Sequence, residues 1–386
     1  MSVMHEQKIQ EIGNIRLSGR FDRTKGPFYM DWSGSSIEFK LKGTFAQIEL
    51  SCNHRGRDQW FVFEIDGKPS TRFRPSEGTA WYTILDSHSP DRQADLTNAC
   101  RHIRVIKDTQ ASYSEEGGTA CCLRLRYDGS LLPLPARKKI EFIGDSITSG
   151  EGALSPLFSE IGSDVSIDEW CSFYYAWNGF TARALDADWQ VVSQGGWGVK
   201  CGWDNNILTN IPSIYDKVCG IIRSPFAEAR GADSTYDFSF DPDVVIINLG
   251  TNDNSGFRQP AWKHPVTGEL HKLRRTGGNP DIPDYAFYNE EDTAAITNEI
   301  VAFVKHVAEK NPRAKIFWVF GMMGQTLWPA IEKARDILRD GGLDRFDTLL
   351  LPEIPISEWG ANEHPLSVAH ERTARIIADH IRPYLE

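Results

Sequence analysis

The amino-acid sequence predicts two domains of different class, an all-β domain followed by an α/β domain. The chain has 386 residues, and one hydrophobic core rarely grows beyond about 250–300 residues. In the first third, apolar and polar residues alternate in short segments, as in half-buried strands. In the remainder, short apolar segments alternate with helical patterns that have one apolar face. These observations predict a β-sandwich of the jelly-roll type, joined to a parallel sheet with helices on both faces.

The first predicted domain covers residues 1–132 and consists of strands. Period-two alternation is clearest in residues 36–43, 46–52, 60–66 and 121–127. Asp-Gly pairs follow two of these segments, and such pairs form tight turns between strands. No long helical pattern interrupts this part of the chain. Short alternating strands between turns are typical of an antiparallel sandwich.

Two prolines, Pro133 and Pro135, mark the predicted boundary, because such sequences favour an extended, stiff connector. We therefore place the second domain at residues 136–386. Its strands are expected at 139–143, 189–193, 244–249, 315–320 and 348–351, with helices around 296–307, 331–338 and 367–381. This alternation predicts a parallel, flavodoxin-like sheet, in which ligands bind beyond the carboxyl ends of the strands. Ser367 is the expected N-cap of the last helix.

Residues with catalytic potential follow three of these strands. Ser146 stands at the turn after the first strand, where a helix N-terminus offers N–H donors. Gly196 follows the second strand and Asn252 the third, so a backbone N–H and a side-chain amide can point to the same place. His364 precedes the last helix. A hydroxyl, an imidazole and neutral donors are the groups that acyl transfer requires.

Some residues of these blocks have a structural alternative. Gly195 or Gly198 could supply the backbone donor in place of Gly196. Asn252 could cap a helix, a position that Asn favours, and have no role in the reaction. Asp145 and Asp253 are interpreted as braces of their loops rather than as reacting groups.

Four sequence blocks, GDSIT, the Gly196 segment, GTND and the late His-Pro, resemble in that order the blocks of the SGNH, or GDSL-type, hydrolase superfamily. The N-terminal stretch GRFDRTKGPFYMDWSGSSIEFKLKGT, followed by a late GDSIT, resembles carbohydrate esterase family 2. That family joins a jelly roll to an SGNH domain, so the resemblance covers nearly all of the chain. It implies an enzyme that removes acetyl groups from plant polysaccharides.

The resemblance also implies a role for each matched residue. Ser146 would be the nucleophile, and His364 would be the general base and then the general acid. The backbone N–H groups of Ser146 and Gly196 and the side chain of Asn252 would form the oxyanion hole. The reaction would need neither a cofactor nor a metal ion.

The residues before His364 depart from the superfamily pattern. An Asp usually stands two or three residues before the catalytic His, whereas this chain has Asn362 and Ala361. Carbohydrate esterase family 2 includes members with a Ser-His dyad whose His is held by a backbone carbonyl, and we expect such a dyad here. The side chain of Asn362 remains an alternative orienter, because its oxygen can accept the imidazole Nδ1–H. A nearby carboxylate, Glu358 or Glu363, is a further alternative.

The chain has twelve Trp residues, and large aromatic side chains often line ligand sites. Trp197 lies inside the second block and Trp359 shortly before the late histidine, so we expect these two to form a wall for the substrate. Trp203 and Trp262, in the long loops, are further candidates. Four others are expected in the core: Trp32, Trp60, Trp81 and Trp318.

Composition limits the partners and the compartment. The formal net charge of −11 argues against a nucleic-acid-binding surface, and no segment approaches the ~18 apolar residues of a membrane helix. The seven Cys residues lack CxxC spacing, so we expect free thiols and no metal site. Residues 1–8 are polar and show no secretory signal, so we expect a cytoplasmic protein, with a processed, secreted form as the alternative. The oligomeric state stays open.

We therefore expect an O-acetyl esterase that acts on acetylated plant-derived oligosaccharides or polysaccharides such as xylan and mannan. Two alternatives stay open. One is a general short-chain esterase or thioesterase, which a series of acyl chain lengths would distinguish. The other is a carbohydrate-binding protein whose hydrolase half is inert, which would bind glycan without releasing acetate.

Overall fold

The computed structural model describes residues 3–86, 100–111, 118–156, 167–221 and 225–386. The chain divides into two compact units, and each unit contains segments from several parts of the sequence. The first, called here the sandwich unit, comprises Met1–Arg137, Val165–Tyr174 and Asp216–Tyr236. The second, called here the hydrolase unit, comprises Lys138–Asp164, Tyr175–Tyr215 and Asp237–Glu386.

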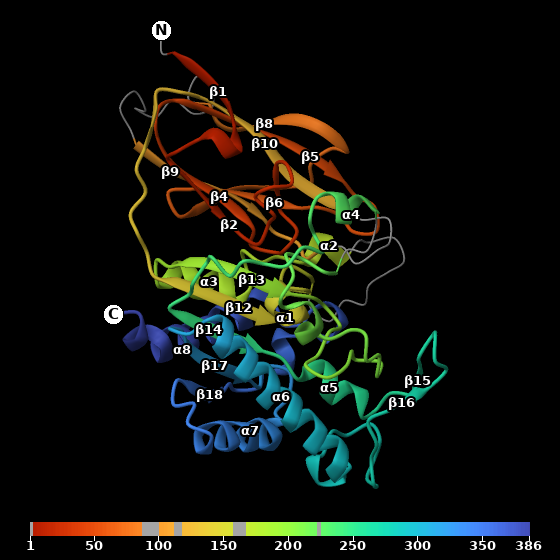
Figure 1. Cartoon of the computed structure of the whole chain (residues 1–386). Helices are drawn as coiled ribbons and strands as arrows, with labels where there is room; N and C mark the ends of the chain where they lie inside the picture. Colours follow the sequence, from red (N-terminus) through yellow and green to blue (C-terminus); the bar gives the residue numbers. More distant parts are fainter. Residues whose placement is uncertain (1–2, 87–99, 112–117, 157–166, 222–224) are drawn as a thin grey trace. The chain divides into compact units, whose positions relative to one another are not determined.

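Two antiparallel sheets form the sandwich unit (Figure 1). The strands of the first sheet, in spatial order, are β1 (Met4–Lys8), β10 (Thr119–Asp128), β5 (Phe45–Asn53) and β8 (Gly78–Asp86), and β3 (Phe28–Tyr29) pairs with β10. Those of the second are β11 (Ser130–Leu132), β4 (Ser36–Lys42), β9 (Cys100–Lys107), β6 (Phe61–Ile65) and β7 (Lys68–Phe73), and β2 (Ile15–Ser18) pairs with β4.

One hydrophobic core joins the two sheets of this unit. Phe39 of β4, Leu50 of β5 and Phe63 of β6 belong to the same buried cluster, and each is at most 3% exposed. Every second residue of these strands faces the cluster, because successive side chains of a strand point to opposite faces. The prediction of an antiparallel two-layer domain is confirmed.

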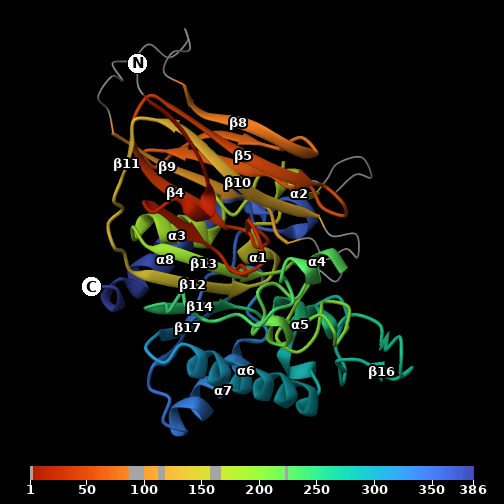
Figure 2. The same ribbon diagram turned by 45° about the horizontal axis from the view of Figure 1, so that its top comes forward.

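A parallel sheet forms the centre of the hydrolase unit. In the described part of the chain its strands, in spatial order, are β13 (Asp188–Ser193), β12 (Lys139–Gly144), β14 (Val244–Asn248), β17 (Lys315–Phe320) and β18 (Phe346–Leu350). Figure 2 shows α6 (Glu290–Lys310) and α7 (Trp328–Asp340) together on one face of this sheet. On the other face α3 (Trp177–Ala184) packs against α8 (Ser367–Ile381). The α/β prediction is confirmed.

The register of the sheet brings three strand ends together. Gly144, the last residue of β12, pairs with Ser193 at the end of β13 and with Asn248 at the end of β14. The segments that follow these residues therefore leave the sheet at one edge. This arrangement places the three sequence blocks after the strands next to each other.

Two segments of the predicted second domain group with the sandwich unit instead. They are Val165–Tyr174, which lies between β12 and β13, and Asp216–Tyr236, which lies between β13 and β14. Contacts inside the sandwich unit explain the grouping: Arg57 pairs with Asp168 at 3.2 Å. The predicted division at 1–132 and 136–386 therefore does not include these two segments, called here the two excursions, in the first unit.

Three local predictions need correction. The N-cap of α8 is Leu366, and Ser367 is the first helical residue. Trp60 and Trp81 are only half-buried, and arginine side chains lie over both rings: the Arg72 guanidinium is 4.4 Å from the Trp60 ring centre. Trp32 and Trp318 are fully buried, as predicted.

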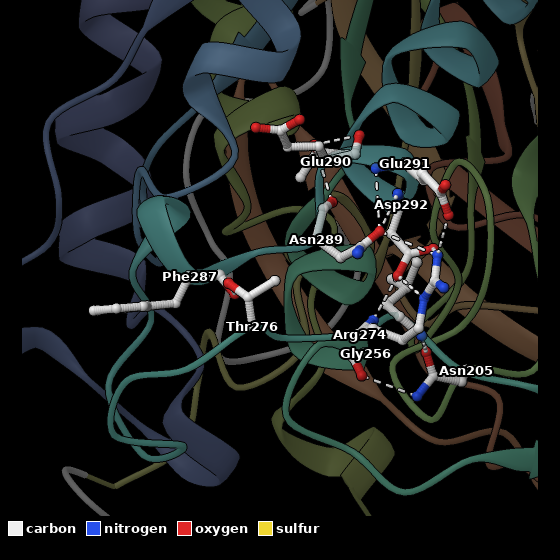
Figure 3. Close-up of polar contacts among 11 residues, drawn as sticks. Asn205, Gly256, Arg274, Thr276, Phe287, Asn289, Glu290, Glu291 and Asp292 are labelled. Atoms are coloured by element: carbon white, nitrogen blue, oxygen red, sulfur yellow. Dashed lines mark hydrogen bonds and ion pairs between the residues drawn. The ribbon is translucent and has the colours of Figure 1, made fainter.

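A long excursion between α5 (Thr251–Gly256) and α6 contains the hairpin of β15 (Trp262–Lys263) and β16 (Leu270–His271). The part of this segment that follows the hairpin is held at the start of α6 (Figure 3). There the Arg274 side chain donates to Asp292 at 2.9 Å and to Glu291 at 2.9 Å. Asn289 caps the same helix end. These contacts hold a long, polar segment against the hydrolase unit.

Among the described residues, no helix combines the length and the apolar character that crossing a bilayer requires.

Candidate active site

Ser146 stands at a tight turn between β12 and the short helix α1 (Ser146–Ser149). A side chain on Gly144 would collide with Thr148, because a Cβ there would lie 2.0 Å from the Thr148 Oγ1 atom. The Asp145 carboxylate caps α1 by accepting the Ile147 N–H at 3.0 Å. The turn thus holds Ser146 at the carboxyl end of β12, where the residue is only 7% exposed.

His364 meets Ser146 across 218 residues of sequence, and its Nε2 lies 2.7 Å from the Ser146 Oγ. The backbone around the histidine is fixed on both sides, since its N–H donates to Ala361 and its carbonyl accepts the Gly360 N–H at 2.7 Å. Gly152 packs so closely that a Cβ there would lie 2.7 Å from the His364 Cβ. A hydroxyl donating to an imidazole at this distance is the geometry of an activated nucleophile.

The Nδ1 of His364 lies 2.8 Å from the backbone carbonyl of Asn362. Nδ1–H therefore donates to that carbonyl, which leaves Nε2 free to accept the serine proton. Asn362 and Glu363 both have left-handed backbone, with φ of 51° and 59°, and this turns the carbonyl toward the ring. The Asn362 side chain is exposed, and Glu358 pairs with Arg372 at 2.5 Å. The orienting group at Asn362 is thus a main-chain dipole rather than an amide side chain or a carboxylate.

Gly196 and Asn252 lie at the same edge of the sheet. Gly196 has φ of 80°, a left-handed conformation that glycine adopts without strain. Asn252 is 8% exposed, and its Nδ2 donates to the Trp197 carbonyl at 3.0 Å and to Asp145 at 3.3 Å. The second contact is long for a hydrogen bond, so this amide can re-aim at a developing oxyanion beside Ser146.

Two buried ionisable groups, Asp145 and His370, lie near the Ser146–His364 dyad. Burial raises the pKa of Asp145 to about 7, and the nearby charge of Asp253 adds to the rise. Burial lowers the pKa of His370 to about 3, and the proximity of His364 acts in the same direction. The Nδ1 of His370 accepts the Trp177 N–H at 3.2 Å. A neutral imidazole at His370 therefore supports α3 and adds no positive charge near the dyad.

The two tryptophans predicted to form a wall for the substrate differ in their surroundings. Trp197 is only 7% exposed, and its carbonyl accepts the Asn252 Nδ2. Trp359 is half-buried, its Nε1 donates to Ile354, and its backbone pairs with Pro365 next to the histidine. Trp203 is 51% exposed.

Trp203, a further candidate from the long loops, lies beside the Gly196 segment. Its N–H donates to the Gly196 carbonyl at 3.1 Å, and its ring lies 3.2 Å from where a Gly196 Cβ would be. Its exposed indole therefore lies beside Gly196. The spacing from the glycine block was visible in the sequence, but the exposure depends on how the loop folds back.

Within the described ranges, no group of three His, Cys, Asp or Glu side chains is arranged to hold a metal ion.

Comparisons with known proteins give a consistent result. A family model described as the carbohydrate esterase 2 N-terminal domain matches residues 17–116. The solved structure of an acetyl xylan esterase from the rumen bacterium Butyrivibrio proteoclasticus is 30% identical, covers 100% of both chains and superposes with a TM-score of 0.90. A family two carbohydrate esterase from Clostridium thermocellum, solved with cellohexaose, is 23% identical over 96% of this chain and 99% of its own, with a TM-score of 0.72, and supports the fold.

Two curated relatives are longer than the aligned region. The cellulase/esterase CelE of Acetivibrio thermocellus is 31% identical over 62% of this chain and 27% of its own length. An acetylxylan esterase/glucomannan deacetylase of Cellvibrio japonicus is 26% identical over 65% of this chain and 61% of its own. The chain therefore matches between a quarter and three fifths of these relatives. The N-terminal family match and the full-length structural match together show that the chain belongs to carbohydrate esterase family 2, a family of SGNH hydrolases.

Proposed function

We propose that this protein is an O-acetyl esterase that removes acetyl groups from plant-derived oligosaccharides or polysaccharides such as xylan and mannan. The observation that carries the proposal is the 2.7 Å contact between Ser146 Oγ and His364 Nε2, in a chain of carbohydrate esterase family 2. The names of the Butyrivibrio and Cellvibrio relatives support the substrate class.

The geometry gives each group a step in the reaction. His364 Nε2 accepts the Ser146 proton while Oγ attacks the acetyl carbonyl. The negative oxygen of the tetrahedral intermediate accepts hydrogen bonds from the backbone N–H groups of Ser146 and Gly196 and from the Asn252 side-chain amide. His364 then gives its proton to the sugar oxygen, which leaves as a hydroxyl, and an acetyl-enzyme remains. Water attacks this ester with His364 again as the base, which releases acetate and restores Ser146.

The Asn362 carbonyl acts throughout as the acceptor of the His364 Nδ1–H. It selects the tautomer whose Nε2 is free, and its dipole stabilises the imidazolium that forms during each step. A carbonyl carries no net charge, so this stabilisation is weaker than that from the usual carboxylate. The dyad therefore relies more on the oxyanion donors than an enzyme with an aspartate does.

Acetate release tests the proposal. The purified protein should release acetate from acetylated xylo- and manno-oligosaccharides and from 4-nitrophenyl acetate. Ser146→Ala should lower kcat by at least about 10⁴-fold, because the variant lacks the attacking oxygen. Ser239→Ala removes an exposed hydroxyl outside the site and should match the wild type. Full activity in Ser146→Ala would overturn the proposal.

The same assay decides between the remaining alternatives. A preference for acetyl over longer acyl esters supports the sugar esterase, whereas rates that rise toward octanoyl esters would indicate a general esterase. Glycan binding without acetate release would indicate an inert hydrolase half. The exposed Trp203 favours the first outcome, because a flat ring beside the acetyl site suits a sugar better than an acyl chain.

The compartment is a separate proposal. The seven cysteines are all free thiols, and six of them are buried. Free thiols favour a reducing compartment, so we propose that the protein handles oligosaccharides in the cytoplasm. Cell fractionation with antibody detection tests this, and recovery of the protein mainly from the medium would contradict it.

A further inference from the structure

Asp253 follows Asn252 in α5, and its side chain is 0% exposed. Its carboxylate accepts three consecutive backbone N–H groups of the loop after β13, from Val199 at 2.9 Å, Lys200 at 2.8 Å and Cys201 at 3.1 Å. One side chain thus satisfies the polar backbone of a whole turn. Such N–H groups have fixed directions, so the carboxylate defines the path of the loop.

The loop also packs against this carboxylate. A Cβ at Gly198 would lie 2.3 Å from the Asp253 Oδ2 and 2.2 Å from the Cys201 carbonyl. A residue with any side chain at Gly198 would therefore push the loop away from α5. The close approach requires both a glycine on the loop and a carboxylate beneath it.

A second tie connects the same two segments next to the reacting atoms. The Trp197 carbonyl, one residue after Gly196, accepts the Asn252 Nδ2 at 3.0 Å. Gly196 and Asn252 are the two oxyanion donors outside α1. Their separation is thus set by the Asn252 contact on one side and by the Asp253 contacts on the other.

An amide in place of this carboxylate cannot make the same contacts. An Asn side chain has one accepting oxygen, and its NH2 group is a donor that would face a backbone N–H. Burial raises the pKa of Asp253, and the three N–H groups oppose this by favouring the carboxylate. The contact set therefore suits an ionised oxygen pair.

We propose that Asp253 is a positioning residue of the oxyanion hole, which holds residues 196–201 against α5 so that the Gly196 N–H and the Asn252 amide converge on one oxygen. The proposal rests on the proposed function only in treating this edge of the sheet as an acyl-transfer site. It concerns the stabilisation of the transition state rather than the choice of sugar.

The test compares Asp253→Asn with the wild type in two assays. The first is the hydrolysis of 4-nitrophenyl acetate, in which kcat should fall about 10–100-fold while KM changes by less than about threefold, because donors are displaced rather than removed. The second is inhibition by methylboronic acid, which adds to a serine hydroxyl and forms a tetrahedral anion. Its Ki should rise by a similar factor, which a general loss of packing would not produce.

Controls separate positioning from folding. Asp281→Asn changes an exposed carboxylate of the hydrolase unit and should leave both readings at the wild-type value. Should Asp253→Asn fail to fold, Gly198→Ala provides the second test, because it moves the loop off the carboxylate and keeps every donor. That variant should show the same loss in kcat and in boronic acid affinity.

A folded Asp253→Asn variant with kcat and Ki within about twofold of the wild type would overturn the proposal, as would a Gly198→Ala variant with both values unchanged. Failure of the proposed function looks different. In that case the wild-type protein would hydrolyse 4-nitrophenyl acetate or bind the boronic acid, yet release no acetate from acetylated oligosaccharides. The effect of Asp253→Asn on kcat and Ki would then still be measured with 4-nitrophenyl acetate and methylboronic acid.

Discussion

Two pairs of buried carboxylates, one pair in each unit, have different partners. In the sandwich unit buried carboxylates meet arginines: Asp31 pairs with Arg230 at 2.6 Å, with side chains 3% and 2% exposed, and Glu64 pairs with Arg104 at 2.8 Å. In the hydrolase unit the buried Asp145 and Asp253 meet backbone N–H groups and an amide. Among the described residues, no Lys or Arg side chain forms an ion pair with either of those two aspartates.

The difference appears in the pKa values. Burial alone would raise the pKa of Glu38, but the hydrogen bond from His102 and the charges of Arg104 and Arg137 hold it well below its usual range. Burial raises the pKa of Asp145 to about 7, because only neutral groups oppose it. The pKa values of two buried carboxyl groups, Glu38 and Asp145, are thus shifted in opposite directions by their partners.

The two kinds of contact have different structural roles. The Asp31–Arg230 pair joins residues 199 positions apart and so fixes one of the excursions into the sandwich unit. The aspartates of the hydrolase unit instead accept backbone N–H groups and so shape the turns near Ser146. The Asp31–Arg230 ion pair fixes one segment through a single contact, whereas Asp253 accepts several backbone N–H groups and so sets the path of a whole turn.

The largest expected effect comes from breaking the buried ion pair of the sandwich unit. Arg230→Ala leaves the Asp31 carboxylate buried without its partner, and should lower the free energy of unfolding by about 3–5 kcal/mol. Urea denaturation measures the change. The double variant Arg230→Met with Asp31→Leu should recover most of the loss, because an apolar pair replaces the ion pair. A loss below about 1 kcal/mol in the single variant would show that the pair does not hold the excursion.

Removing a donor from the hydrolase unit should affect activity rather than stability. Asn252→Ala should lower kcat about 10²–10³-fold, equivalent to about 2.7–4 kcal/mol of transition-state stabilisation, with little change in KM. Steady-state kinetics with 4-nitrophenyl acetate measures this. Asn14→Ala, an exposed amide in the sandwich unit, is the matched control. A parallel loss of melting temperature and activity would indicate a structural role for Asn252 instead.

The pH dependence of stability should have opposite signs in the two units. The pKa of Glu38 is depressed in the folded state, so its stabilisation is present above about pH 4.5 and is lost as the pH falls. The pKa of Asp145 is raised from 3.8 to about 7, so folding loses stability as the pH rises through that window.

Two isosteric variants separate these contributions. Glu38→Gln should be destabilised at pH 7, and the difference from the wild type should shrink as the pH falls below 4.5. Asp145→Asn should instead gain stability relative to the wild type between pH 4 and pH 7. Unfolding free energies from urea titrations at several pH values provide the measurement. Parallel curves for both variants and the wild type would refute the assignment.

The smallest effect is expected at an exposed pair. Arg375 and Glu371 lie one turn apart in α8 at 2.5 Å, with side chains 72% and 48% exposed. Arg375→Ala should cost no more than about 0.5 kcal/mol, because solvent screens the charges. The decrease in unfolding free energy caused by Arg375→Ala should also disappear in 1 M salt, whereas the decrease caused by Arg230→Ala should persist. An effect equal to that of Arg230→Ala would remove the distinction between buried and exposed pairs.

Much of the fold follows from periodicity in the sequence. Residues 244–249 are almost wholly apolar, which predicts a strand covered on both faces, and β14 occupies Val244–Asn248. The alternation in 36–43 predicts a half-buried strand; β4 does occupy Ser36–Lys42, but Ser36 and Glu38 on its polar face are buried as well. Burial of this kind repeats at the period of the local structure, so it is visible without the tertiary fold.

Other features have no local signal. Which unit a loop packs against depends on partners far away in the sequence, so the two excursions into the sandwich unit were not predicted. Trp197 and Trp203 are the same residue type in one loop, yet one is 7% and the other 51% exposed. The acceptor for His364 at Asn362 is a carbonyl, and every residue carries one, so side-chain chemistry cannot reveal it.

The sequence by itself predicted two domains of different class, the order of the four blocks, and Ser146, His364, Gly196 and Asn252 as candidate site residues. The tertiary structure decided which of these groups touch, and through which atoms. Parallel strands end at one edge of a sheet, so Gly144, Ser193 and Asn248 deliver three distant segments to one place. The left-handed backbone at Asn362 then turns a carbonyl to His364, whose Nε2 meets Ser146 across 218 residues. Directions of this kind depend on long-range packing, and that is why only the folded chain shows them.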